Sequence, residues 1–313
     1  MTFSITVLMT VHNESTYLRT AIDSILAQTF RDFHFLIVDD ASTDDSREIV
    51  RSYQDDRIKL VSLEKNVGQT AALNLGLTHI ETPWIARMDA DDYSAPERLE
   101  RQMETVNADS ALDCVGTFSW LFKSNPLTID GTICNPVDKE EIKQIILGTP
   151  LVHGSIVISK KSILAIGGYD ERYRISQDVD LFDRLLEHYS AANVPEFLLG
   201  IRQHPGQASR SMVALNENVE LGTQRLHSTR YSGAQLRLVR KNLGLTYFVR
   251  ARRHFGRINP LLMAQDLFCG IKISPASTIP NAIRAFGIEM LPTTWRAGVK
   301  TLIGKQRSGG ICQ

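Results

Sequence analysis

The segment RMDADDYSAPERL, residues 87–99, gathers three carboxylates within four positions: Asp89, Asp91 and Asp92. An apolar run leads into it, which predicts a buried strand over residues 84–88 that ends at the acids. Strand alternation would direct Asp89 and Asp91 to one side of the chain and Asp92 to the other. Because neighbouring carboxylates repel each other, the cluster fits a site where Mg²⁺ or Mn²⁺ joins one or two carboxylates to phosphate oxygens. The alternative is a solvated turn in which Asp92 caps the helix that follows.

The chain before this cluster alternates short apolar runs with segments of helical spacing. The apolar runs predict four strands, over residues 3–11, 33–38, 58–63 and 84–88. Helices between near-continuous apolar strands indicate an α/β fold with a mostly parallel sheet flanked by helices on both faces. Such sheets bind ligands at the carboxyl ends of their strands. Asp39 and Asp40, which end the second run, should therefore share a crevice with Asp89 and Asp91.

The remainder of the chain is less regular and then becomes basic. Further strands are predicted over residues 112–122, 154–158 and 193–201, and further helices over residues 138–147 and 178–188. Residues 222–313 contain fifteen Lys and Arg residues against two acids, a net charge of +13, so residues 1–221 carry −13. This asymmetry predicts two domains, residues 1–221 and 222–313, the second of them basic and mainly helical.

Composition limits the class of protein. The hydrophobic fraction of 43% and the charged fraction of 22% are ordinary for a globular protein. The four cysteines are far apart and form no CxxC pair, which fits idle thiols in a reducing compartment. The N-terminus lacks the basic region and long apolar core of a signal peptide, and no uncharged apolar run is long enough to predict a membrane span. These features predict a cytoplasmic protein.

Several other polar residues occupy positions suited to a ligand, and each also has an ordinary structural explanation. Asp40 could cap a helix, or it could accept hydrogen bonds from a nucleobase or a ribose. Gly68 could form only a tight turn, or it could let a phosphate approach the helix that follows. Asp178 could stabilise a helix N-terminus or act as a general base. His204 lies in a predicted loop after a strand, a position suited to ligand binding.

Six blocks of the sequence, in the same order, resemble the inverting family-2 nucleotide-sugar glycosyltransferases. The blocks are ITVLMTVHNE (residues 5–14), SILAQTFRDFHFLIVDDASTDDS (24–46), NVGQTAALNLGL (66–77), ARMDADDYSAPERL (86–99), HGSIVISKKSILAIGGYDERYRISQDVDLFDRL (153–185) and RQHPGQAS (202–209). The resemblance covers residues 4–211. It implies the GT-A fold, a Rossmann-like sheet, to which the basic, helical C-terminal region would be an extension.

The resemblance also implies roles for individual residues. Asp178 would be the catalytic base, and Asp91 and His204 would contact the divalent metal ion, His204 alternatively the diphosphate. The residues implied in substrate binding are Thr10, Asn13, Asp40, Asn66, Gly68 and Asp89. Thr10 and Asp40 would contact the nucleoside base, and Asp89 the ribose or the metal. The chain departs from the family at Thr10, where proline is usual, at Gln177, where glutamate is common, and at Leu73, where a basic residue is common.

The predicted function is inverting transfer of a sugar from a nucleotide-diphosphate donor, a UDP-sugar by family usage, to a hydroxyl group of a saccharide or lipid-linked acceptor. The expected cofactor is Mg²⁺ or Mn²⁺, and the expected setting is cell-surface polysaccharide synthesis. The basic region, through Arg252, Arg253, Arg257, Phe248 and Phe255, could lie peripherally on the anionic inner face of a membrane. It could equally be a solvated helical subdomain. No nucleic-acid-binding motif is present, and no nucleic-acid partner is expected.

Three alternatives remain from the sequence. A signalling receiver domain also gathers acids at strand ends, but its acidic pair follows the first strand, where this chain has Thr10 to Asn13. A sugar-nucleotide nucleotidyltransferase would need a glycine-rich basic loop there, and residues 11–17 contain neither glycine nor Lys or Arg. A catalytically silent sugar-nucleotide-binding relative is consistent with Gln177. The presence of Asp91 and Asp178 favours an active enzyme.

Overall fold

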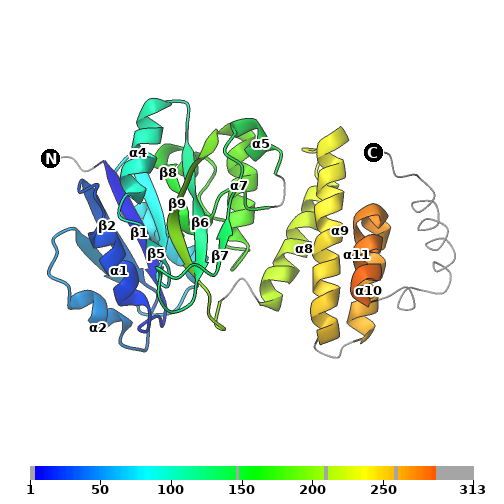
Figure 1. Cartoon of the computed structure of the whole chain (residues 1–313), viewed down its shortest axis with the longest axis horizontal. Coiled ribbons are helices and arrows are strands. Elements are labelled where there is room, and N and C mark those ends of the chain that lie inside the picture. Colours follow the sequence, from blue (N-terminus) through cyan, green and yellow to red (C-terminus); the bar gives the residue numbers. More distant parts are fainter. Residues whose placement is uncertain (1–3, 146–147, 208–210, 257–259, 287–313) are drawn as a thin grey trace. The chain divides into compact units, whose positions relative to one another are not determined.

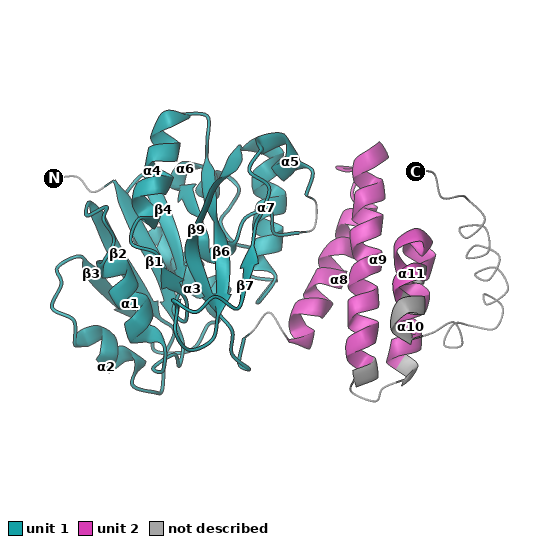
Figure 2. Ribbon diagram, in the orientation of Figure 1, with its two compact units in different colours: residues 1–210 teal, residues 211–313 magenta. Residues whose placement is uncertain are grey.

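The computed structural model describes residues 4–145, 148–207, 211–256 and 260–286 (Figure 1). The chain divides into two compact units, Met1–Arg210 (unit 1) and Ser211–Gln313 (unit 2) (Figure 2). The boundary differs from the one at 221/222 that charge indicates. It falls before helix α8 (Met212–His227), whose acids Glu217 and Glu220 belong to unit 2. The change from an acidic to a basic composition therefore lies farther along the chain than the boundary between the two units.

The first half of unit 1 is the predicted alternation of strands and helices. Its elements are β1 (Ile5–Val11), α1 (Leu18–Leu26), β2 (Phe33–Asp39), α2 (Ser46–Arg51), β3 (Ile58–Ser62), α3 (Gln69–Thr78) and β4 (Trp84–Asp89). The four strands pair in parallel in the order β3-β2-β1-β4. Their carboxyl ends therefore meet at one edge of the sheet, as the sequence predicts.

The second half of unit 1 extends this sheet in mixed directions. Its elements are β5 (Tyr93–Ser94), α4 (Arg98–Ala108), β6 (Cys114–Phe122), β7 (Gly131–Ile133), α5 (Lys139–Lys143), the 3₁₀ helix η1 (His153–Ser155), β8 (Val157–Ser159), α6 (Lys160–Ala165), α7 (Gln177–His188) and β9 (Ala191–Arg202). The strand order continues from β4 through β8, β6 and β9 to β5, with β7 paired to β6. The predicted strand over 154–158 begins only at Val157, because η1 occupies its first residues. Of the predicted helix over 138–147, residues 146–147 lie outside the described residues.

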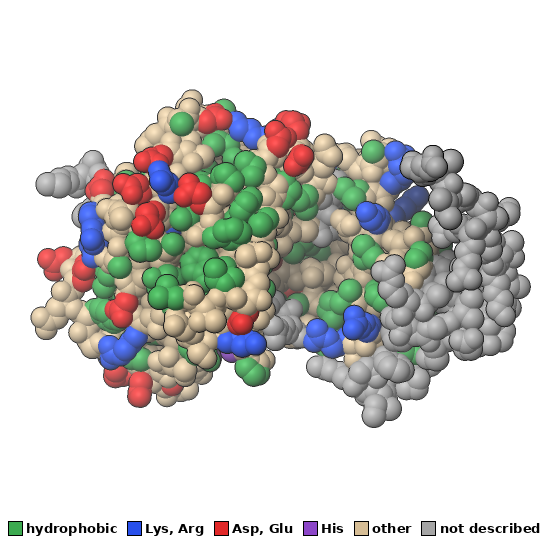
Figure 3. Space-filling model, in the orientation of Figure 1, with side chains coloured by type: hydrophobic (Ala, Val, Ile, Leu, Met, Phe, Trp, Pro, Cys, Tyr) green, Lys and Arg blue, Asp and Glu red, His purple; other side chains and the backbone are tan. Residues whose placement is uncertain are grey.

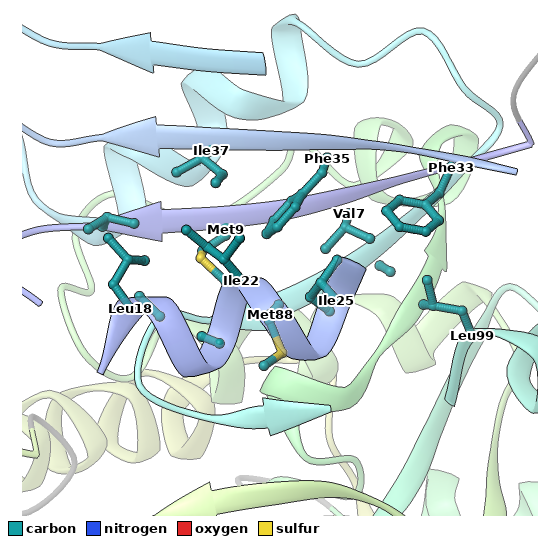
Figure 4. Close-up of a cluster of buried hydrophobic side chains, with 14 of the residues drawn as sticks. Val7, Met9, Leu18, Ile22, Ile25, Phe33, Phe35, Ile37, Met88 and Leu99 are labelled. Carbon is teal, nitrogen blue, oxygen red and sulfur yellow. The ribbon is translucent and has the colours of Figure 1, made fainter. Parts of the chain in front are cut away.

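Two hydrophobic clusters cover the two faces of the parallel strands. On one face, Val7 and Met9 of β1 pack against α1 (Figure 4). On the other face, Leu8 packs with Leu73 of α3 and Phe182 of α7. Alternate residues of one strand thus enter different clusters, which explains why the strands read as continuous apolar runs. Helices on both faces fix the sheet, and the strand ends carry the polar residues described below.

Unit 2 consists of helices in the part that the structure describes: α8, α9 (Gly233–Gly256), α10 (Pro260–Ile273) and α11 (Pro275–Phe286). Helix α9 packs against the other three. The buried carboxylate of Asp266 in α10 accepts hydrogen bonds from Arg250 of α9 at 2.9 and 2.6 Å, and Arg250 also donates to Asn216 of α8 at 3.1 Å. None of the helices in the described ranges has the length and apolar character that crossing a bilayer requires.

Candidate active site

Two adjoining cavities lie where strands β1, β2 and β4 end. The Asp178 cavity, of about 280 Å³, is lined by Asp178, His153 and His204 among others. The Asp40 cavity, of about 440 Å³, is lined by Asp40 and residues near it. Four residues line both cavities: Glu14, Gln69, Asp89 and Asp91. The acids from two strand ends therefore border one connected space, as the parallel topology requires.

The acidic cluster differs in detail from the predicted alternation. Strand β4 ends at Asp89, so Asp91 and Asp92 lie in the turn that follows, and all three carboxylates line the Asp178 cavity. Asp92 does not cap the next helix: it is buried, and its Oδ1 accepts a hydrogen bond from the backbone N–H of Arg202 at 2.9 Å. Helix α4 begins instead after Glu97, without a side-chain cap. The solvated-turn interpretation is therefore wrong for Asp92.

The end of strand β9 holds this turn from the opposite side. Arg202 donates from Nε to the carbonyl oxygen of Asp91 at 2.8 Å. Its guanidinium lies 4.5 Å from the ring centroid of Tyr17 and 4.5 Å from that of Phe122. Two residues later, Nε2 of His204 lies 3.0 Å from Oδ2 of Asp91. The loop position of His204 is visible in the sequence, whereas the role of Arg202 is not, because its contacts arise only when β9 pairs beside the turn.

Burial and, after it, the charge of neighbouring acids raise the pKa of two groups in the site. Burial, followed by the charge of Asp89, raises the pKa of Asp91. Burial, followed by Asp91, raises the pKa of Glu14 to about 7. Nothing in the local sequence marks Glu14 as a site residue, because its neighbours Asp89 and Asp91 come from a segment more than seventy residues away. The side chain of Asp89 is paired with the buried guanidinium of Arg87, which offsets part of the negative charge.

The chemistry of these side chains fits a hard divalent cation that is shared with a substrate. Asp91 and His204 converge in the cavity, and Asp89 lines it beside them. Among the described residues, no group of three or more His, Cys, Asp or Glu side chains forms a complete ligand set. Mg²⁺ and Mn²⁺ commonly take only one or two protein carboxylates and fill the remaining positions with phosphate oxygens and water. The residues present therefore fit a cation held jointly with a diphosphate.

Asp178 lies in the first turn of α7, at the wall of the same cavity. Its Oδ1 accepts a hydrogen bond from the backbone N–H of Val179 at 2.8 Å. Burial raises the pKa of Asp178 to about 6. A carboxyl group with a pKa near neutrality can take up a proton during a reaction and release it afterwards. His153 also lines the cavity, but burial, together with Arg87, holds its pKa well below the usual range, so it is neutral.

The Asp40 cavity contains Thr10, Asn66 and Gly68, as well as Asp40 itself. The two carboxylate oxygens of Asp40 accept hydrogen bonds from the backbone N–H groups of Val67, at 2.7 Å, and Gly68, at 2.8 Å. Gly68 has a φ of 90°, which L-residues rarely adopt, so this close approach depends on glycine. Asp40 thus shapes the wall of the cavity. Its contact with a nucleobase stays a prediction.

Asn13 lines neither cavity. It adopts a left-handed φ of 57°, and its Oδ1 accepts a hydrogen bond from the backbone N–H of Thr43 at 2.8 Å. Asn13 therefore ties the loop after β1 to the loop after β2. Its direct role in binding substrate stays a prediction.

Comparisons with known proteins agree with this architecture. A family model described as Glycosyl transferase family 2 matches residues 6–165. The chain is 34% identical to WbnJ of Escherichia coli, an O-antigen biosynthesis glycosyltransferase, over 68% of this chain and 85% of WbnJ. It is 32% identical to EpsE of Bacillus subtilis (strain 168), a protein named as a glycosyltransferase, over 64% of this chain and 73% of EpsE.

Solved structures show the same fold at low sequence identity. S. aureus TarS 1–349 in complex with UDP-GlcNAc superimposes with a TM-score of 0.63 at 16% identity, over 99% of this chain and 93% of that one. The mannosyltransferase PcManGT from Pyrobaculum calidifontis, in complex with GDP-Man and Mn²⁺, gives 0.62 at 18% identity, over 96% of this chain and 84% of that one. The motifs, the sheet order, the family match and these likenesses agree, and the chain belongs to glycosyltransferase family 2.

Proposed function

We propose that this protein transfers a sugar from a UDP-sugar donor to a hydroxyl group of an acceptor, with inversion at the anomeric carbon. One observation carries the proposal: the candidate base Asp178 and the acids Asp89 and Asp91 border one cavity, which shares a wall with the cavity that contains Asp40. This arrangement would put the nucleotide in the Asp40 cavity, the diphosphate at the shared acids and the acceptor beside Asp178.

In the proposed reaction, each of these residues has a separate role. The oxygen of the acceptor hydroxyl attacks the anomeric carbon, and Asp178 accepts the proton of that hydroxyl. The bond from that carbon to the diphosphate breaks on the opposite face, so a single displacement inverts the configuration. A divalent cation, when bound at Asp91 and His204, would supply positive charge that offsets the charge growing on the leaving diphosphate. Asp89 and Asp40 position the donor and shape the wall on its side.

The acceptor that we propose is a saccharide or a lipid-linked saccharide in polysaccharide synthesis. Support comes from the relative WbnJ, which is named for O-antigen biosynthesis. The UDP carrier is supported by the UDP-GlcNAc in the TarS structure, whereas PcManGT contains GDP-Man. GDP-sugars are therefore the competitors that a donor screen has to include.

Donor hydrolysis and transfer test the proposal directly. UDP- and GDP-sugars would be incubated with the protein, with Mn²⁺ or with EDTA, and released nucleotide would be measured with and without candidate saccharide acceptors. We expect UDP release from one UDP-sugar that requires the metal. Asp91→Asn should lose metal-dependent donor binding, and Asp178→Asn should bind donor but lose transfer. Tight binding of UDP-sugars by the wild type without any turnover would favour the silent relative instead.

We also propose that unit 2 associates peripherally with an anionic membrane surface. Helix α9 contains six Lys and Arg residues and no acid. Arg237, Arg240, Lys241 and Arg252 among them are exposed. On the face shown in Figure 3, the charged side chains of unit 2 are mainly Lys and Arg. Of the residues that the sequence suggests for this role, Arg257 and the side chain of Phe255 lie outside the part of the chain that the structure describes.

A further inference from the structure

Gln177 is a buried polar residue at the wall of the Asp178 cavity. Its side chain is only 4% exposed, and it precedes Asp178 at the start of α7. Its Nε2 donates a hydrogen bond to Oε1 of Gln69 at 3.2 Å. Its Oε1 is buried and has no hydrogen-bond partner among the residues that the structure describes. Most buried side-chain polar atoms in proteins have a hydrogen-bond partner. We therefore expect Oε1 of Gln177 to accept a hydrogen bond from a ligand that enters the cavity.

The position of the glutamine pair indicates which part of a substrate it would meet. Gln69 begins α3 and lines both cavities, whereas Gln177 lines the Asp178 cavity and adjoins the candidate base. The pair therefore lies between the nucleotide side and the acceptor side of the connected space. When donor and acceptor are both bound, the transferred sugar lies between the nucleotide and the reacting hydroxyl of the acceptor.

The chemistry of the pair favours a neutral hydroxyl group as its ligand. Gln69 and Gln177 share one hydrogen bond, which uses one of the two polar atoms of the Gln177 amide. The other atom, oxygen or nitrogen, stays unpaired in either orientation of the amide groups. A hydroxyl can both donate and accept, so it satisfies either orientation. An ammonium group or a phosphate satisfies only one. Glu14, Asp89 and Asp91 already crowd this space with carboxylates, and the neutral amide adds no further charge that would repel the donor.

We infer that Gln177, oriented by Gln69, binds a hydroxyl group of the transferred sugar and thereby selects the donor. This inference rests on the proposed function, because it assumes that a UDP-sugar occupies the connected cavities. Gln177 is a specificity-determining residue in this assignment, and Gln69 is a positioning residue. Glutamate is common at this position in the resembling family, so the neutral amide is a feature of this chain.

The test compares wild type with Gln177→Met, which keeps the length of the side chain and removes both polar atoms. Each protein would be given the UDP-sugar that wild type uses best and analogues of it that lack one sugar hydroxyl. For wild type, we expect one deoxy analogue to lower kcat/KM by about 10–100-fold, the effect of leaving one buried polar group without its partner. With the parent donor, the kcat/KM of Gln177→Met should be lower than that of wild type by a similar factor. With that one deoxy analogue, the kcat/KM of Gln177→Met should fall no further.

Binding measurements separate this role from a structural one. By calorimetry, Gln177→Met should bind UDP as wild type does and bind the UDP-sugar more weakly. The melting temperature of the ligand-free variant should change little, because the lost hydrogen bond to Gln69 is offset by removal of an unpaired buried atom. Gln177→Glu, which keeps an acceptor oxygen, should retain the preference for that hydroxyl. Gln69→Met should weaken the preference without affecting UDP binding.

Two results would overturn the inference, and they are distinguishable. If every deoxy analogue lowers kcat/KM by the same factor in Gln177→Met as in wild type, Gln177 does not bind a sugar hydroxyl, while the proposed function stands. If wild type binds and turns over no nucleotide sugar, the proposed function is wrong, and the donor assignment of Gln177 is wrong with it.

Discussion

Asp178 must be ionised to accept a proton, yet its surroundings favour the protonated form. Burial raises its pKa from 3.8 to about 6. The folded protein therefore holds this proton over a pH range where the unfolded chain has released it, so the group stabilises the fold least at high pH. The residue that we propose as the base is one whose ionised form opposes folding. This opposition is common at active sites.

The predicted consequence is that Asp178→Asn stabilises the protein above pH 6. The amide cannot ionise, so the variant avoids the cost of a buried charge; with partial exposure of the side chain we expect a gain of about 1–2 kcal/mol. The gain should shrink as pH falls from about 6 to about 4, because wild type is then protonated as well. Urea unfolding at several pH values measures it. A gain that is independent of pH would contradict the assignment of the raised pKa to Asp178.

Gly154 controls how closely the acids approach η1. A Cβ at this position would lie 3.0 Å from Oδ2 of Asp89 and 3.3 Å from Oδ2 of Asp92. Gly154→Ala should therefore displace these carboxylates and weaken Mn²⁺-dependent donor binding by about tenfold, which corresponds to about 1.4 kcal/mol. Calorimetric titration of UDP with and without Mn²⁺ measures the effect. Gly131→Ala is the matched control, because its Cβ would meet the side chain of Leu121 at 3.4 Å, an ordinary van der Waals distance. Equal effects of both variants would refute the steric explanation.

The sequence identified the candidate acids more readily than their partners. Asp40, Asp89 and Asp91 follow apolar runs, and the edge at which such runs end is fixed once the strands are parallel. Glu14 and Gln69 have no such local signal. They line both cavities because the loop after β1 and the start of α3 fold toward the turn after β4. Their part in the site is set by tertiary packing, which local periodicity does not encode.

At the scale of elements, the end of β9 joins the acidic turn to the sheet. Arg202 donates to the carbonyl oxygens of Asp91, at 2.8 Å, and Lys123, at 2.9 Å, between the rings of Tyr17 and Phe122. Lysine cannot reproduce a planar group that stacks and donates in several directions. The orientation of the turn thus depends on one side chain from a strand more than a hundred residues away.

Arg202→Lys should lower the free energy of unfolding by about 1–3 kcal/mol, the range for a broken buried hydrogen-bond network. It should also weaken Mn²⁺-dependent UDP binding, because the turn that carries Asp91 loses its support. Arg101→Lys on the exposed face of α4 is the control and should change stability by less than about 0.5 kcal/mol. Urea denaturation and calorimetry provide the two readouts. Arg202→Lys with wild-type stability and wild-type UDP binding would show that β9 does not hold the turn.

Elements of the fold were predictable where burial leaves a local pattern. Strands β1 and β2 are buried on both faces, and the predicted runs end within two residues of their observed ends. Strands β5 and β7 have only two and three residues and were not predicted. They exist because β9 and β6 present free edges for pairing. A pairing partner far along the chain gives a short strand no periodicity that the sequence could reveal.

At the scale of the whole molecule, charge and fold divide the chain at different places. Unit 2 includes acids in α8, but α9 is basic throughout. Arg250 of α9 pairs with the buried Asp266 inside the helical unit. The side chains of Arg237, Arg240, Lys241 and Arg252 of α9, by contrast, are exposed. A cluster of such residues attracts anionic lipid headgroups, each contributing about 1 kcal/mol near the surface.

This attraction predicts salt-sensitive binding of the full chain to anionic vesicles. We expect co-sedimentation with vesicles that contain phosphatidylglycerol in about 0.1 M salt, loss of binding in about 0.5 M salt, and none with purely zwitterionic vesicles. Replacing Arg237, Arg240 and Lys241 with Glu should abolish binding, because the three residues are exposed and their reversal leaves the buried pair intact. The matched control reverses three exposed arginines of unit 1, Arg19, Arg31 and Arg51. If that control loses binding as fully as the α9 variant, net charge rather than α9 is responsible. If wild type never sediments with anionic vesicles, unit 2 is a solvated helical subdomain.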